Sequence, residues 1–418
     1  MRLNYFDIFT PDNSVASIEQ FAGRQSEIDQ ISDALQSSGT SMVIYGNRGV
    51  GKSSLAHQMV SIAENNSATI SRLTHEPMKE FDFLCVQVKA EDSISDIESL
   101  LVRILRSEDA LAPWLPLEIR ETVGKISAGM EFGVGAAKAK VGAGKEAKLQ
   151  KPTLPDDIVV TFQNACNSVI KSGVAKDGIL IVVDEFDRIR DKTGFASLLK
   201  SFEGTKVRFA IVGVAQDIEL LVIDHESISR QIAGGSILVK PMSDSEVRQI
   251  FEQAHQRMNS NVVFNNDAIE YITACAKGHP YIVHLLGKQA LVSTVRGREA
   301  RVTESVAKAA LREISSQGSN VPLELEYRKA VKNSPAREFI LKRFSREDKE
   351  PIRTTDIYAD ISSTLGIEKE AISVYMGHLC SKEYGPVLEK SGERYYRFLN
   401  SVFKAYIAAR DYEVYKPS

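Results

Sequence analysis

The sequence predicts an α/β protein: a doubly wound, parallel-sheet P-loop domain comes first, then a helical lid, then a C-terminal winged helix. Apolar runs such as Ile179–Val183 are uninterrupted, which is typical of strands that helices cover on both faces. Helical patterns alternate with these runs along residues 1–236, and a glycine-rich motif follows the first run, as in a doubly wound sheet. The strands are expected at Ser41–Tyr45, Phe83–Val88, Gly178–Val183 and Arg208–Val214.

Two further blocks follow the sheet domain. Residues 237–320 open with a strand-like stretch and continue as helical patterns, so we expect the lid there. Residues 321–418 contain helical patterns and then two strand-like stretches around a Lys390–Glu393 turn, which is the order of elements in a winged helix. Within the first block, an insertion at about 128–150 is rich in small residues and lysine. We expect either a mobile surface segment or a hairpin that contacts DNA or a neighbouring subunit.

Composition restricts the classes of function. The net charge of −3 excludes a whole-molecule field that attracts nucleic acid, so DNA would need a local basic patch. The four cysteines lie far apart, which argues against a zinc site or a disulfide framework and favours a reducing, cytoplasmic location. No signal peptide and no membrane partner are expected, because no apolar run is long enough for either.

The first expected strand is followed by Gly46–Ser53, which matches the P-loop pattern GxxxxGK[ST], and then by an amphipathic helix. That context is the one the motif requires. Glycines let backbone N–H groups turn toward phosphate oxygens, and the helix N-terminus adds the positive end of its dipole. Lys52 is expected to reach the β- and γ-phosphates, and Ser53 to bind Mg²⁺. The residues expected to contact ATP are Gly46, Asn47, Arg48, Gly49, Val50, Gly51, Lys52, Ser53 and Ser54.

The apolar run Ile179–Val183 ends in two carboxylates, Asp184 and Glu185. At the carboxyl end of a strand, Asp184 is expected to hold Mg²⁺, usually through water. Glu185 is expected to orient or deprotonate the attacking water. The alternative is a solvated acidic turn, since Asp187 follows.

A further motif, Phe21–Glu27, precedes the P-loop. With these motifs in this order, the chain resembles the AAA+/STAND ATPases, in particular those similar to archaeal and eukaryotic replication initiators and their prokaryotic relatives. The resemblance covers nearly the whole chain. In that family this box lies near the adenine, which implies that Gly23 and Arg24 line the base and ribose. Gln25 is a mild departure, because Glu is common there.

Three later positions take expected roles from the same resemblance. Gln216 ends a strand that resembles sensor 1 and is expected near the γ-phosphate, although Asn is commoner there. Arg230 resembles an arginine finger for the next subunit's ATP; the alternative is a surface arginine paired with Glu226. Pro280 resembles the STAND proline that contacts adenine, and it also suits the first position of a helix. Tyr281 stands where initiators carry a sensor-2 arginine, which favours the STAND-like interpretation.

The C-terminal block offers basic side chains for DNA phosphates. The expected recognition helix, Glu368–Glu383, lacks a set of Arg, Asn and Gln side chains for reading bases. A winged helix that contacts protein or inhibits the ATPase is the alternative. The expected DNA contacts, here called the wing cations, are Lys382, Lys390, Arg394 and Arg397.

Two functions remain open at this point. In the first, the chain is a slow ATPase that couples nucleotide state to assembly, as a homo-oligomer, on double-stranded DNA or a partner protein. In the second, ATP is a structural ligand and the winged helix recruits an effector protein. Glu185 favours hydrolysis, because a protein that only binds ATP has no need of it.

Overall fold

The computed structural model describes residues 4–37, 41–124, 156–214, 234–316, 321–347 and 349–410. Gln216, Arg230 and the insertion at 128–150 lie outside these residues, so their expected roles stay predictions. Within the described part of the chain, no helix is both long enough and apolar enough to cross a membrane.

The first block contains a five-stranded sheet in the order β2-β3-β4-β1-β5, with all neighbours parallel. All four expected strands form. The expected strand at the start of the lid, β5, instead pairs with β1 and is an edge of this sheet. The strands are β1 (Met42–Gly46), β2 (Phe83–Lys89), β3 (Gly178–Asp184), β4 (Val207–Gly213) and β5 (Ser236–Val239).

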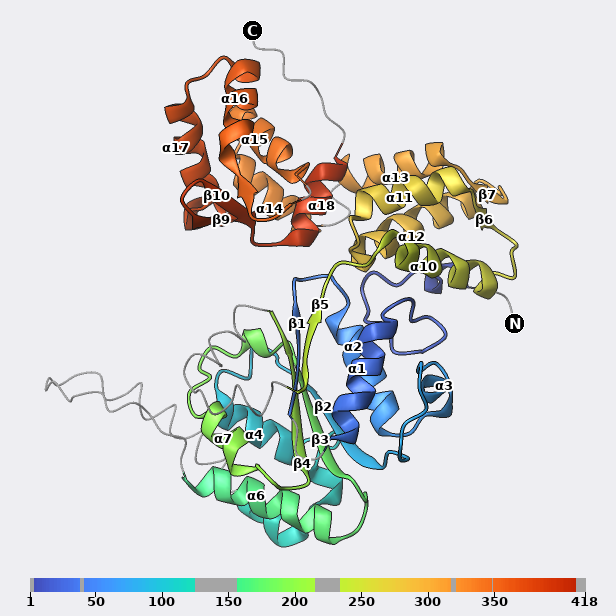
Figure 1. Cartoon of the computed structure of the whole chain (residues 1–418), viewed down its shortest axis with the longest axis vertical. Coiled ribbons are helices and arrows are strands. Elements are labelled where there is room, and N and C mark those ends of the chain that lie inside the picture. The colour runs from blue at the N-terminus through green and yellow to red at the C-terminus, as the bar shows by residue number, and fades with distance from the viewer. Residues whose placement is uncertain are drawn as a thin grey trace, which may run out of the picture.

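Helices cover both faces of the sheet, so the doubly wound prediction is confirmed (Figure 1). Side chains of β3 alternate between two cores: Ile181 packs into one and Val182 into the other. One face carries α1 (Gln25–Gln36), α2 (Lys52–Ala63) and α3 (Ser67–Ile70). The other face carries α4 (Ile97–Arg106), α6 (Asp156–Lys171) and α7 (Phe195–Ser201).

The lid, here residues 240–316, is helical as expected. A capping box between Ser243 and Glu246 starts its first helix. The amino-terminal segment, which the sequence patterns did not place, also packs here: the Phe9 ring contacts Phe251 and Phe264. The lid elements are α10 (Asp244–Arg257), β6 (Val263–Phe264), α11 (Asn266–Ala276), α12 (Pro280–Arg296), β7 (Arg301–Val302) and α13 (Glu304–Ser316), and η1 (Tyr5–Asp7) lies beside α12.

The C-terminal block, here residues 321–410, contains the expected helices followed by a β-hairpin. A short strand, β8, adds to the hairpin and gives the order β8-β10-β9. Helix α18, which follows the hairpin, was not expected. The elements are α14 (Val321–Val331), α15 (Pro335–Ser345), β8 (Ile352–Arg353), α16 (Thr354–Leu365), α17 (Lys369–Leu379), η4 (Lys382–Tyr384), β9 (Leu388–Gly392), β10 (Tyr395–Phe398) and α18 (Ser401–Ala409).

The lid and the C-terminal block share one apolar core. Helix α18 contacts both α11 and α12. Its buried residues Phe403 and Ile407 belong to the same cluster as Ile282 and Leu286 of the lid. Figure 1 shows α18 lying between the other C-terminal helices and the lid. The two parts are therefore joined by packing as well as by the chain.

Candidate functional site

Glycines set the path of the P-loop between β1 and α2. A Cβ atom on Gly46 would lie 2.4 Å from the carbonyl oxygen of Val239 on β5. Gly51, the N-cap of α2, has a φ of 98°, and Gly49 has a φ of 75°, which disfavour any residue with a side chain. The loop therefore turns tightly at the carboxyl end of β1 and ends at the amino end of α2.

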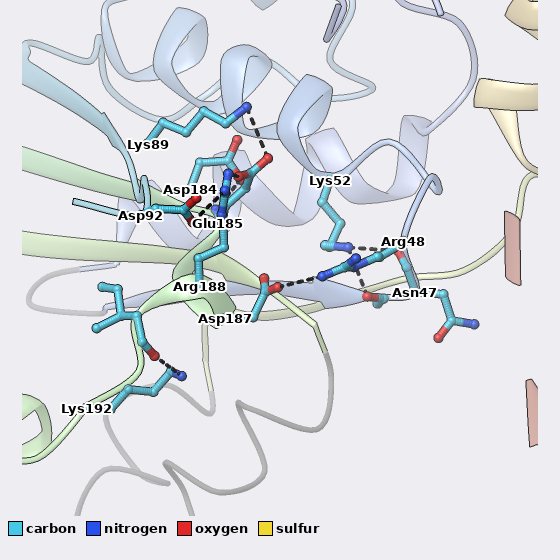
Figure 2. Close-up of polar contacts among 12 residues, drawn as sticks. Asn47, Arg48, Lys52, Lys89, Asp92, Asp184, Glu185, Asp187, Arg188 and Lys192 are labelled. Carbon is cyan, nitrogen blue, oxygen red and sulfur yellow. Dashed lines mark hydrogen bonds and ion pairs between the residues drawn. The ribbon is translucent and has the colours of Figure 1, made fainter. Parts of the chain in front are cut away.

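Lys52 is the first residue of α2, and its side chain folds back over the loop. Its Nζ donates to the carbonyl oxygens of Gly46 at 3.0 Å and of Asn47 at 2.8 Å (Figure 2). Burial lowers the pKa of Lys52 to about 8, although the charges of Asp187 and Asp184 act to raise it. A partly desolvated ammonium at a helix N-terminus is a strong site for phosphate oxygens.

Asp184 and Glu185 lie at the carboxyl end of β3, as expected. Asp184 is only 7% exposed, and its Oδ1 accepts a hydrogen bond from the backbone N–H of Glu185 at 2.8 Å. Glu185 has a φ of 53°, so the chain turns sharply into η3 (Phe186–Arg188). The charges of both acids act to raise the pKa of Lys52, and that of Asp184 has the larger effect.

The Glu185 carboxylate is held by two cations that the sequence analysis did not select. Lys89, the last residue of β2, lies 3.1 Å away, and Arg188 lies 2.8 Å away. Arg188 also pairs with Asp92 at 2.8 Å (Figure 2). Burial raises the pKa of the Glu185 carboxyl, but the hydrogen bonds from Arg188 and Lys89 outweigh burial and lower it. Glu185 is thus a weak proton acceptor in this arrangement.

A cavity of about 900 Å³ opens over the P-loop. Lys52, Ser53, Ser54, Asp184 and Glu185 all line it, so the structure brings these expected residues together. Other lining residues come from the lid, including Pro280 and Tyr281 at the start of α12, and from Thr10–Val15 near the amino terminus.

The segment Thr10–Val15 is fixed to both sides of the cavity. The backbone N–H of Thr10 donates to His284 Nδ1 on α12 at 3.2 Å, and that of Val15 donates to Ser54 Oγ on α2 at 2.9 Å. Neither bond follows a sequence pattern, because each joins residues far apart in the chain. This segment therefore ties the lid to the P-loop helix.

Gly23 and Arg24 are not among the described residues that line the cavity. Arg24 has a φ of 62° and a buried side chain, whose guanidinium donates to the carbonyl oxygen of Val50 at 2.8 Å and pairs with Glu27 at 2.9 Å. Its backbone N–H donates to Glu246 of α10 at 2.8 Å. Through these contacts Arg24 links the P-loop to the lid. The expectation that it lines the base and ribose finds no support in these contacts.

The wing cations lie on the C-terminal block, and none lines the cavity among the described residues. Lys382, Lys390 and Arg394 are exposed. Arg397 is half-buried on β10 and pairs with Glu389 on β9. Three of the four cations therefore face solvent.

The described residues contain no group of three or more His, Cys, Asp and Glu side chains that could hold a metal ion by themselves. Mg²⁺ commonly binds through one or two protein oxygens together with substrate phosphates. Ser53 and Asp184, both in the cavity wall, fit such an incomplete donor set.

Part of the chain matches a known family. Residues 20–205 match the AAA ATPase domain family. A search of the curated proteins finds no match.

Three solved structures resemble this chain at low sequence identity. The Aeropyrum pernix ORC2 protein, solved as ADPNP and ADP complexes, is 15% identical with a TM-score of 0.49, covering 97% of each chain. The Aeropyrum pernix ORC1 protein, in complex with DNA, is 15% identical with a TM-score of 0.45, covering 97% of this chain and 95% of that one. The Thermotoga maritima RuvB Holliday junction branch migration motor is 15% identical with a TM-score of 0.44, covering 94% and 96%.

Proposed function

We propose that this chain, whose residues 20–205 carry an AAA ATPase domain, is a nucleotide-dependent switch that binds Mg-ATP in the cavity over the P-loop and hydrolyses it slowly. One observation carries the proposal: Lys52, Ser53, Asp184 and Glu185 line the same cavity of about 900 Å³, which residues of the lid and of the amino-terminal segment also line. We also propose the division into an ATPase core (1–236), a lid (237–320) and a winged helix (321–418).

Binding uses the P-loop. Lys52 exchanges the two loop carbonyls for β- and γ-phosphate oxygens, and the glycine-shaped loop presents its backbone N–H groups to the same phosphates. Mg²⁺, held by Ser53, Asp184 and the phosphates, would neutralise phosphate charge. Pro280 of the lid lies close to Gly51, where an added Cβ would sit 3.7 Å from the proline ring. This proximity supports the proposal that nucleotide in the loop influences the position of the lid.

Hydrolysis requires Glu185 to take a proton from the attacking water. Its pairs with Lys89 and Arg188 oppose this, so turnover depends on a rearrangement that loosens them. Gln216 near the γ-phosphate and Arg230 from a neighbouring subunit are proposed to complete the site. A site completed in this way is active only in the assembled state.

The output of the switch is proposed to be assembly on double-stranded DNA or on a partner protein. The exposed wing cations support contact with DNA phosphates. The second candidate function, a scaffold that keeps ATP as a structural ligand, is favoured by one observation: Glu185 is held by two cations and has a lowered pKa. In that case the winged helix recruits an effector protein.

Two substitutions test the assignment. Lys52→Ala should abolish ATP binding, because the phosphates lose the ammonium at the start of α2. Glu185→Gln should keep binding and stop turnover, because an amide cannot accept the proton. Lys206→Ala is the matched control, since Lys206 also donates to a backbone carbonyl, that of Lys176 at 2.8 Å, but does not line the cavity. Nucleotide titration and phosphate release are measured at rising protein concentration.

The results separate the two functions. Turnover that rises with assembly and disappears in Glu185→Gln supports the switch. Tight binding with a flat background rate supports the scaffold. Near-native affinity in Lys52→Ala contradicts the phosphate site itself.

A further inference from the structure

Arg48 places a second cation at the P-loop, in addition to Lys52. It lies between Gly46 and Gly49, and its side chain lines the cavity. The guanidinium points toward Asp187, with 3.6 Å between Nη2 and Oδ2. Figure 2 shows the Arg48 guanidinium directed toward the Asp187 carboxylate. The positive charge of Arg48 lowers the pKa of Lys52. Only burial and the charges of the two nearby aspartates have larger effects on that pKa.

We infer that Arg48 is a catalytic cation supplied in cis: its guanidinium binds the γ-phosphoryl oxygens of the nucleotide as the bond to the leaving group breaks. This inference rests on the proposed ATPase function. The reaction it serves is hydrolysis, in which the water oxygen bonds to the γ-phosphorus, the bond to the β–γ bridging oxygen breaks, and Glu185 takes the water proton. Arg48 forms no covalent bond and stabilises charge on the transferring group.

The pair with Asp187 does not prevent this role. At 3.6 Å it exceeds the range of a hydrogen bond, and the Arg48 side chain is 66% exposed, so the contact is a weak, solvent-screened ion pair. A phosphoryl group carries more charge than a carboxylate and suits the planar fork of a guanidinium. Arg48 also acts electrostatically on Glu326 of α14. A bound phosphoryl group would compete with these carboxylates for the guanidinium.

The other arginines of the cavity wall are differently placed. Arg188 holds Glu185 and Asp92, and Arg103 pairs with Asp109. In the lid, Pro280 is followed by Tyr281, so a phenol and not a guanidinium lines the cavity at that position. Among the described arginines that line the cavity, Arg48 is the one carried by the P-loop itself.

The test separates transition-state from ground-state binding. ADP alone and ADP with aluminium fluoride, which mimics the transferring phosphoryl group, are titrated into wild type, Arg48→Ala and Arg48→Lys. Turnover is measured in parallel across protein concentrations. Arg248→Ala is the control for loss of a surface arginine pair, because Arg248 pairs with Glu270 at 3.4 Å outside the cavity wall.

Arg48→Ala is expected to keep ADP affinity and to lose about 10³-fold in turnover at each protein concentration where wild type is active. It should lose a comparable factor in affinity for the fluoride complex. Arg48→Lys should give turnover and fluoride-complex affinity between those of wild type and Arg48→Ala, because an ammonium keeps the charge but lacks the planar fork of the guanidinium. Unchanged turnover in Arg48→Ala, or equal losses of ADP and fluoride-complex affinity, would overturn the inference.

A second background tests a merely structural role. Asp187→Asn removes the negative charge that pairs with Arg48 and keeps a side chain of similar size. If Arg48 acts on the phosphoryl group, Arg48→Ala weakens fluoride-complex binding equally in both backgrounds. If Arg48 only anchors Asp187, its effect disappears in Asp187→Asn and the inference is wrong. Absence of turnover in wild type, with ADP binding that needs Lys52, would instead contradict the hydrolysis proposal and the catalytic role together.

Discussion

Replacing Gly49 by alanine should loosen the contact between the P-loop and helix α18. A Cβ atom on Gly49 would lie 2.1 Å from Cγ2 of Val402 and 3.6 Å from its Cβ. Val402 is buried in the first turn of α18. The clash therefore involves a methyl group that cannot withdraw into solvent, and it is relieved when α18 moves off the loop.

The magnitude has two parts that behave differently. The φ of 75° at Gly49 strains an alanine by about 1–2 kcal/mol, but this strain is present whether or not α18 is docked. Overpacking of a buried contact costs about 1–3 kcal/mol, and only the docked form suffers it. A penalty of that size favours local opening by roughly 5- to 150-fold.

Hydrogen exchange of residues 400–410 measures the opening. The amides of Val402 and Phe403 are hydrogen-bonded to Asn400 Oδ1 at 3.1 and 3.3 Å and report on the first turn of α18. In an otherwise wild-type chain, Gly49→Ala should speed the exchange of these two amides by roughly 5- to 150-fold. In a Val402→Ala background it should add nothing, because Cγ2 is gone and the remaining 3.6 Å contact is ordinary. Equal acceleration in both backgrounds would refute the reasoning.

Three other predictions concern the site and its output. ATP affinity should fall as pH rises above about 8, because burial lowers the pKa of Lys52 to that value and the charged form that binds phosphate is lost above it. An ATP affinity that stays unchanged between pH 7 and pH 10 would contradict this. Arg230→Ala should lower turnover only in the assembled state, and mixing it with Glu185→Gln should restore some activity at mixed interfaces; no recovery with assembly confirmed would argue for a structural Arg230. Replacing the wing cations by alanine should weaken duplex binding for all sequences and flatten a salt dependence whose slope is about −0.9 per neutralised phosphate; superimposable curves in a filter-binding salt series would remove the wing from DNA binding.

The parts of the fold and site that the sequence predicted have local signatures. The run Ile179–Val183 is apolar at every position, so it indicates a strand buried on both faces. The spacing of Gly46, Gly49 and Gly51 before Lys52 indicates the loop, and their φ values and close neighbours explain why those positions need glycine. The pair Asp184–Glu185 ends its strand as predicted.

The remaining features come from contacts between segments far apart in the chain. Lys89 meets Glu185 only because β2 and β3 are neighbours in the sheet and their carboxyl ends coincide. Thr10–Val15 has no periodicity, and its place follows from bonds to α2 and α12. The contacts of Arg24 are also long-range: its buried guanidinium donates to the carbonyl oxygen of Val50, and its left-handed backbone is not revealed by a single sequence.

The apolar core that joins the lid to the C-terminal block affects how the protein can be divided into fragments. Phe403 and Ile407 of α18 are buried in one core with Ile282 and Leu286 of α12. Cutting the chain between residues 316 and 321 therefore divides this hydrophobic core between the two fragments. Each fragment would expose a contiguous apolar patch of the kind that causes aggregation. Fragments intended for study of DNA or partner binding should therefore keep residues 240–410 together.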